Sequence, residues 1–239
     1  MHEYYNKINL LDRTFYPEDL NQTRNIACVV AVSDPYIEIA LQNLFRLESW
    51  DVCILTDKPE RFGDYFYIEK YESAIFSLCD KISFSLRMAS KFRHGVTLID
   101  AGELMYVKQH FIDSHQKYTN FICKGTSVVC NTILNGTNLG KNLRPHIELL
   151  NLGENEHIHA LDEKVIYIPY NEKLVDVRYY MDLVRPSIDH ATIWDVTKGM
   201  HLGRGEGAGL AIAIKRAGLE VNFYEDDPLI PQEMDILDN

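Results

Sequence analysis

The stretch that decides the fold is residues 81–106, KISFSLRMASKFRHGVTLIDAGELMY. Its first half carries apolar side chains at helical spacing on one broad arc, namely Ile82, Phe84, Leu86, Met88, Ala89 and Phe92. Gly95 is a natural place for such a helix to end. Residues 96–99 then form a short apolar, β-branched run, which is typical of a strand covered on both faces. The stretch therefore predicts a helix, a buried strand and an acidic loop.

The acidic loop carries two carboxylates, Asp100 and Glu103, directly after the predicted strand. In an open α/β sheet, ligands bind just beyond the carboxyl ends of the strands. Both side chains are therefore candidates to bind a cation or a ligand hydroxyl group. An acidic turn that merely leaves a core strand explains the same residues, and the segment taken alone favours that simpler interpretation.

The residues before this stretch predict a strand, a helix and a second strand. Residues 25–32, NIACVVAV, form a buried strand that runs into Ser33 and a helix start, with Asp34 as N-cap and Pro35 at the first helical position. A second apolar strand, residues 51–55, ends at Thr56-Asp57. This order predicts a parallel strand pair with a right-handed crossover.

From residue 62 onward the pattern predicts shorter elements. The predicted strands are 62–69, 120–123, 127–130, 165–168, 191–196 and 219–224. The predicted helices are 108–116, 145–152, 171–184 and 206–217. Lys124-Gly125-Thr126 predicts a hairpin turn between two of the strands, Arg185-Pro186 predicts a helix end, and residues 135–141 and 197–209 predict loops.

Together these elements predict an α/β fold: a single domain with a mixed, mostly parallel sheet flanked by helices. Its expected parts are an N-terminal arm over residues 1–24, the α/β domain over residues 25–224 and an acidic C-terminal tail over residues 225–239. A chain of 239 residues with 46% hydrophobic residues suits one domain of this size.

Composition and charge restrict the partners and the compartment. A formal net charge of −11 with no long basic run disfavours a nucleic acid partner. No apolar run approaches the roughly 20 residues of a membrane helix, so no membrane span is expected. Five cysteines, an odd number without a CxxC motif, favour reduced thiols. With no secretory signal at the start, these features predict a cytoplasmic protein.

The order and spacing of three pieces resemble nucleotide-sugar-dependent glycosyltransferases of the A-type fold. The pieces are the strand that turns into a helix at Ser33-Asp34-Pro35-Tyr36, the strand that ends at Leu55-Thr56-Asp57, and the helix and strand that end at Asp100-Ala101-Gly102-Glu103. In these enzymes an apolar strand is followed by an Asp-x-Asp motif. Residues 194–218 look like the acceptor side of such enzymes, so the resemblance covers most of residues 25–220. It implies a hexosyl- or pentosyltransferase with the A-type, nucleotide-diphospho-sugar transferase-like fold.

The resemblance implies a role for each matching residue on the donor side. The nucleobase would be held by Ala31, Val32, Ser33 and Tyr36. Asp57 would bind the base or the ribose, and Arg87 would lie near the diphosphate or the sugar. Asp100 would contact the ribose or sugar and help to hold a divalent metal, Mn²⁺ or Mg²⁺. The donor would be a nucleotide sugar and the acceptor a hydroxyl group of unknown identity.

The resemblance implies further roles on the metal and acceptor side. His201 and Glu103 are candidate metal ligands beside Asp100, because hard cations neutralise a leaving diphosphate. Glu206 and Asp100 are the candidate catalytic groups, because an acceptor hydroxyl needs a base within hydrogen-bond reach. The chain departs from the motif where Gly102 stands in place of the second Asp. That departure leaves open an altered metal site, metal-independent transfer, or a fold that has lost catalysis.

Two other function classes compete with this interpretation. Residues 203–208, GRGEGA, match a loose dinucleotide-binding fingerprint with Glu225-Asp226 about 20 residues further on, which would indicate an oxidoreductase. The fingerprint arrives late in the chain and places Glu206 inside the turn, which disfavours a pyrophosphate. The other class is a non-catalytic scaffold that binds a nucleotide or a protein partner.

Overall fold

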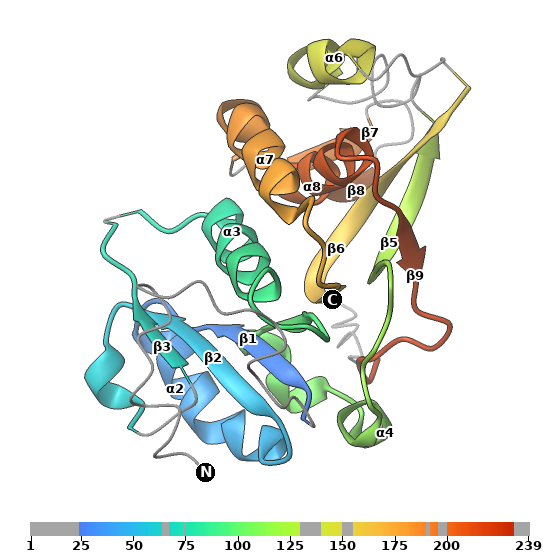
Figure 1. Ribbon diagram of the computed structural model, residues 1–239. Coiled ribbons are helices and arrows are strands. Elements are labelled where there is room, and N and C mark those ends of the chain that lie inside the picture. The colour runs from blue at the N-terminus through green and yellow to red at the C-terminus, as the bar shows by residue number, and fades with distance from the viewer. Residues whose placement is uncertain are drawn as a thin grey trace, which may run out of the picture.

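A seven-stranded mixed sheet forms the centre of the computed structural model (Figure 1). The structure describes residues 24–63, 67–73, 75–129, 140–149, 155–189, 192–195 and 200–231. Over these residues the strand order is β3-β2-β1-β4-β6-β5-β9. The strands are β1 (Ile26–Val30), β2 (Asp51–Thr56), β3 (Tyr67–Lys70), β4 (Val96–Asp100), β5 (Phe121–Val129), β6 (His157–Ile168) and β9 (Val221–Phe223). Only β6 runs antiparallel to its neighbours.

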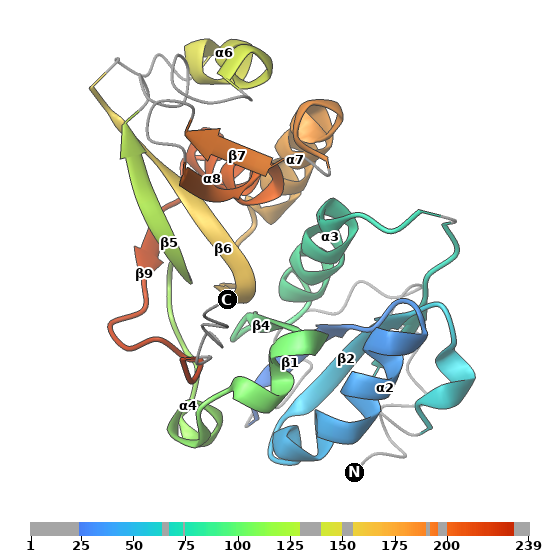
Figure 2. The same ribbon diagram turned by 180° about the vertical axis from the view of Figure 1, so that it is seen from behind.

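Helices cover both faces of this sheet, as Figures 1 and 2 show from opposite sides. The α-helices are α2 (Asp34–Asn43), α3 (Leu78–Ala89), α4 (Gln109–Asp113), α6 (Gly140–Leu149), α7 (Leu174–Ile188) and α8 (Gly205–Arg216). The 3₁₀ helices are η2 (Leu44–Leu47), η3 (Pro59–Arg61) and η4 (Ala101–Tyr106). A separate antiparallel pair consists of β7 (Thr192–Asp195) and β8 (Met200–Arg204). The predicted fold class is confirmed.

The apolar core lies in two layers because β1 alternates its side chains between the two faces. Cys28 and Val30 pack with side chains of α3, α7 and α8. Ala27 and Val29 pack with side chains of α2, η4 and α4 on the other face. All five residues of β1 are buried, which explains why this strand reads as a continuous apolar run.

A capping box fixes the first turn of α3. The Ser77 hydroxyl accepts a hydrogen bond from the Cys79 N–H, and the Asp80 carboxylate accepts one from the Ser77 N–H. Asp80 also pairs with Arg185 at 2.7 Å and accepts a hydrogen bond from the Tyr71 hydroxyl at 2.7 Å. A single N-cap is worth about 1 kcal/mol. These contacts hold the start of α3 between β3 and α7.

The predicted hairpin between residues 120 and 130 is wrong, because β5 runs through it without a turn. Lys124 and Gly125 pair with Asp162 and Leu161 of β6, so the backbone of this segment stays in the sheet. The turn-forming composition is overridden by the long antiparallel partner strand. Of the predicted strands, residues 64–66, 130, 191 and 196 lie outside the described residues.

Three helix and loop boundaries also differ from the prediction. α7 continues through Pro186, because Ile188 in its last turn is fully buried in the core. α6 begins at Gly140, inside the predicted loop, and contains Pro145. The described part of the predicted loop 197–209 consists of β8 and the start of α8.

The ends of the chain are described only in part. Residues 1–23 of the expected arm and residues 232–239 of the expected tail lie outside the described residues. Residues 228–230 lie against η4, where the Ile230 N–H donates to the Tyr106 carbonyl at 2.7 Å and the Lys108 N–H donates to the Pro228 carbonyl at 2.8 Å. In the described part of the chain, no helix combines the length and the apolar character that a membrane crossing requires.

A glycine in α8 allows close packing on β6, which generates a prediction. A Cβ on Gly207 would lie 2.0 Å from the Leu161 carbonyl oxygen, whereas a Cβ on Gly102 would meet nothing within 4 Å. Gly→Ala in a helix normally stabilises by about 1 kcal/mol. We expect Gly207→Ala instead to lower the free energy of unfolding by more than about 2 kcal/mol, measured by urea denaturation.

Gly102→Ala in η4 is the matched control, and we expect it to change the free energy of unfolding by less than about 1 kcal/mol. A Gly207→Ala variant as stable as the wild type would contradict the close approach of α8 to β6.

Candidate functional site

The carboxyl ends of β1, β2 and β4 lie side by side at one edge of the sheet. Val30, at the end of β1, pairs with Leu55 of β2 on one side and with Asp100 of β4 on the other. The residues that follow these strands therefore meet at the same edge. Ser33, Asp57 and Asp100 therefore share this edge of the sheet.

Ser33 and Asp57 are in direct contact. The Ser33 N–H donates a hydrogen bond to Asp57 Oδ1 at 3.0 Å. Ser33 has φ 78° and ψ 152°, and it has the only positive φ of a non-glycine residue among the described residues. Such a conformation costs about 1–3 kcal/mol and persists only where the surroundings enforce it. Here the bond to Asp57 and the start of α2, where the Ile37 N–H donates to the Ser33 carbonyl, hold it.

The other residues expected to bind the nucleobase lie close to this turn. Tyr36, in the first turn of α2, is 50% exposed, so one part of its ring is open to a ligand. Ala31 is buried, and its N–H is already bonded to the Leu55 carbonyl. Val32 is half-buried. The nucleobase role of these residues stays a prediction.

A buried lysine stands behind Asp100. Lys81, in the first turn of α3, is 1% exposed. Its ammonium group donates to Asp100 Oδ2 at 3.1 Å and to the Glu163 carbonyl at 3.1 Å. Because a buried charge must be paired and hydrogen-bonded to be tolerated, these two oxygens fix the lysine. Lys81 thereby connects α3, β4 and β6.

A bulge in β6 places two more charged side chains at the end of β4. Between β5 and β6 the pairing shifts from Cys123–Ile166 to Lys124–Asp162, which leaves residues 163–165 of β6 without partners on β5. Bulges of this kind re-aim side chains and are frequent beside functional sites. Here the bulge carries Glu163 and Lys164 to the edge of the sheet.

Both bulge residues form ion pairs with segments next to β4. Lys164 Nζ lies 2.9 Å from Glu103 Oε1 in η4. Glu163 Oε1 lies 3.7 Å from Arg204 Nε at the start of α8. Together with the pair of Lys81 and Asp100, these contacts form one charge cluster at the carboxyl end of β4, which we call the β4 cluster.

Burial and neighbouring charges shift two pKa values in the β4 cluster. Burial raises the pKa of Glu163, and the positive charges of Lys81 and Arg204 partly offset that effect. The hydrogen bond to Glu103 raises the pKa of Lys164, and the charges of Asp162 and Asp100 add to the increase. Lys164 is therefore charged at neutral pH, and the field of Asp100 reaches it.

The described residues do not fit a divalent metal site at Asp100 and Glu103. Each of these carboxylates already contacts a lysine ammonium, at 3.1 Å and 2.9 Å. Within the described ranges there is no group of three or more potential metal ligands. The backbone of His201 lies in β8 opposite Trp194, and its side chain lies outside the description. The expected metal stays a prediction.

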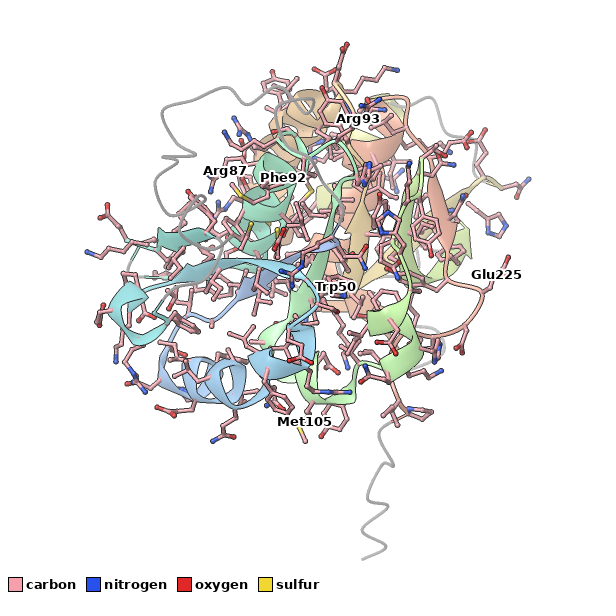
Figure 3. The ribbon with its side chains drawn as sticks, turned by 60° about the horizontal axis from the view of Figure 1, so that its bottom comes forward. Trp50, Arg87, Phe92, Arg93, Met105 and Glu225 are labelled. Carbon is pink, nitrogen blue, oxygen red and sulfur yellow. The ribbon has the colours of Figure 1, made fainter. Side chains whose placement is uncertain are left out.

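Arg87 lies in α3 and forms an ion pair with a glutamate of β3. Its guanidinium group contacts both carboxylate oxygens of Glu69, at 3.0 Å and 2.5 Å, and its side chain projects from α3 in Figure 3. Arg87 lies six positions after Lys81, which corresponds to about 9 Å along the axis of α3. The basic residue that contacts Asp100 is therefore Lys81, and the expected contact of Arg87 with a diphosphate stays a prediction.

Glu206 lies in the first turn of α8 and is 1% exposed. Burial raises the pKa of Cys79 to about 12, and the charges of Asp189 and Glu206 contribute to the increase. This contribution places Glu206 near the start of α3. A buried carboxylate does not face an acceptor directly, so the catalytic role of Glu206 stays a prediction.

Sequence reasoning missed Lys81, Glu163, Lys164 and Arg204. For Lys81 a signal exists, because it shares the buried arc of α3 with Ser85 and Met88 at helical spacing. For Glu163 and Lys164 no local signal exists, since their placement depends on the register between β5 and β6.

Comparison with known proteins gives one weak structural likeness. No protein-family model matches the chain, and no curated protein matches it. Among solved structures, the bifunctional IspDF from Campylobacter jejuni is similar over 85% of this chain, with 11% sequence identity and a TM-score of 0.42. The matched region spans 50% of that protein's chain. A likeness of this size carries no argument about activity.

The strained turn at Ser33 generates a prediction. Glycine adopts positive φ without the steric cost of a Cβ, so we expect Ser33→Gly to raise the free energy of unfolding by about 1 kcal/mol. The hydrogen bond from the residue 33 N–H to Asp57 is kept in this variant. Ser33→Val should destabilise the protein, because a β-branched residue tolerates this conformation least.

Urea denaturation of both variants beside the wild type measures these changes. Equal stability of Ser33→Gly and Ser33→Val would mean that residue 33 does not adopt the strained conformation.

Proposed function

We propose that this chain is a glycosyltransferase that moves a sugar from a nucleotide-activated donor to a hydroxyl acceptor. The observation that carries the proposal is the pair of polar contacts at neighbouring strand ends. Asp57, directly after β2, accepts a hydrogen bond from the N–H of Ser33, which follows β1. Asp100, the last residue of β4, accepts one from the Lys81 ammonium group. Ligands of open α/β sheets bind at such strand ends.

The distance between these two contacts suits an extended ligand. β1 separates β2 from β4, and neighbouring strands lie about 4.8 Å apart, so the two strand ends lie about 10 Å apart. The first contact involves Ser33, three residues before the half-exposed Tyr36 in the first turn of α2. The second belongs to the β4 cluster, whose exposed members are basic. This polarity supports a ligand with an aromatic base at one end and phosphates at the other.

The proposal assigns a role to each end of the site. Tyr36 stacks on the base, and Asp57 accepts a hydrogen bond from the base or the ribose. Asp100 contacts the ribose or the donor sugar. The acceptor hydroxyl group requires a carboxylate within hydrogen-bond reach for its deprotonation, and Asp100, with its side chain 31% exposed, supplies one.

The glycine loop does not support a dinucleotide-binding oxidoreductase. β8, which precedes α8, pairs with β7 outside the seven-stranded sheet. The fingerprint glycines Gly203 and Gly205 lie in β8 and at the first residue of α8. They therefore do not join a strand of the seven-stranded sheet to a helix, as a dinucleotide-binding turn does.

A thermal-shift series with nucleoside diphosphates and nucleotide sugars tests the proposal. A ligand that binds the native state raises Tm in proportion to the logarithm of its concentration. We expect one base to raise Tm in the wild type. Asp57→Asn should reduce affinity for that ligand about tenfold, because one hydrogen bond to a charged group is worth about 1.5–3 kcal/mol.

Asp182→Asn, on an exposed position of α7, is the matched control and should bind like the wild type. If none of these ligands raises Tm, the proposal fails and the scaffold interpretation is favoured. If the ligand binds Asp57→Asn and the wild type equally, the base is bound elsewhere.

A further inference from the structure

We infer that the β4 cluster binds the diphosphate of the donor through Lys164 and Arg204, without a divalent metal at Asp100 and Glu103. This inference rests on the proposed function and specifies which residues bind the phosphate groups of the donor. It concerns residues that the comparison with the Asp-x-Asp motif does not assign.

Lys81 is the resident cation of Asp100. Its ammonium group lies between Asp100 Oδ2 and the Glu163 carbonyl, at 3.1 Å from each, and is withdrawn from solvent. A divalent ion bound to the same carboxylate would lie next to this ammonium group. Repulsion between two cations in a partly buried site disfavours that arrangement. Lys81 thus supplies the positive charge that a metal would bring to Asp100.

Glu103 is also paired with a lysine ammonium group in place of a metal ion. Its carboxylate lies 2.9 Å from the ammonium group of Lys164. The Glu103 side chain is 12% exposed, whereas the Lys164 side chain is 45% exposed. The Glu103 carboxylate is therefore the more buried partner and orients Lys164, whose ammonium group faces solvent.

Arg204 and Glu163 repeat this arrangement from another element. The Glu163 side chain is 11% exposed and the Arg204 side chain is 61% exposed. In both pairs the carboxylate is the inner partner and the cation is the outer partner. An incoming ligand meets the cations first, although the chain as a whole has a formal net charge of −11.

The exposed partners match the chemistry of a diphosphate. Lysine and arginine bind phosphate oxygens through charge-assisted hydrogen bonds, and a guanidinium group adds a planar pair of donors. Lys164 lies in the bulge of β6 and Arg204 is the last residue of β8, so the two cations come from different elements around Asp100. They can therefore contact two ends of one diphosphate while Asp100 faces the sugar.

Isothermal titration calorimetry of inorganic pyrophosphate and of UDP, GDP, CDP and ADP tests the inference. Each ligand is titrated into the full-length protein in EDTA and in Mn²⁺. We expect pyrophosphate and the preferred nucleoside diphosphate to bind equally well under both conditions. Lys164→Met and Arg204→Met should each weaken this binding about tenfold or more, as loss of a charge-assisted contact predicts.

The matched control is Lys215→Met. Lys215 has similar exposure, 47%, and pairs with Glu156 on the surface at 3.6 Å. We expect this variant to bind within about twofold of the wild type. Because all three replaced side chains are exposed, the variants should keep the wild-type Tm.

Binding of Mn²⁺ is measured directly by electron paramagnetic resonance, without any nucleotide. The inference predicts that the wild type leaves the spectrum of free Mn²⁺ unchanged. Loss of that spectrum in the wild type but not in Asp100→Asn would overturn it. Nucleoside diphosphate binding that requires Mn²⁺ would also overturn it while leaving the proposed function intact. Binding of pyrophosphate but of no nucleotide would support the cation site and contradict the proposed function.

Discussion

The buried ammonium group of Lys81 is the contact on which the site depends. Removing a charge from water costs several kcal/mol, and Asp100 and the Glu163 carbonyl offset that cost. They do so only if the start of α3, the end of β4 and the bulge of β6 lie together. The capping box at Ser77 and the pairing of Asp80 with Arg185 hold the first part of this arrangement. One lysine therefore links the helix, the sheet and the site.

The polarity of the surrounding ion pairs gives the site its chemical character. Exposed salt bridges contribute little to stability, so the pairs of Lys164 with Glu103 and of Arg204 with Glu163 are better explained by orientation than by stability. In each pair a part-buried carboxylate holds an exposed cation. An acidic protein thereby presents two exposed cations close to Asp100, which suits an anionic ligand.

The first half of the fold could be predicted from sequence because its signals are local. β1, β2 and β4 are apolar runs of buried strands, and Ser33-Asp34-Pro35 marks the start of α2. The rule that parallel strands end at one edge predicts that Ser33 and Asp57 lie near each other, but not the hydrogen bond between them. The second half depends on long-range pairing. β5 continues through Lys124-Gly125-Thr126 because β6 pairs with it, and the bulge that places Lys164 has no signature in the sequence.

The direct test of metal-free diphosphate binding is a crystal structure of the protein with its preferred nucleoside diphosphate and Mn²⁺, with anomalous data at the manganese edge. We expect a diphosphate in contact with Lys164 and Arg204, the base beside Tyr36, and no anomalous peak at Asp100. A manganese peak between Asp100 and Glu103, with Lys81 displaced from Asp100, would contradict it.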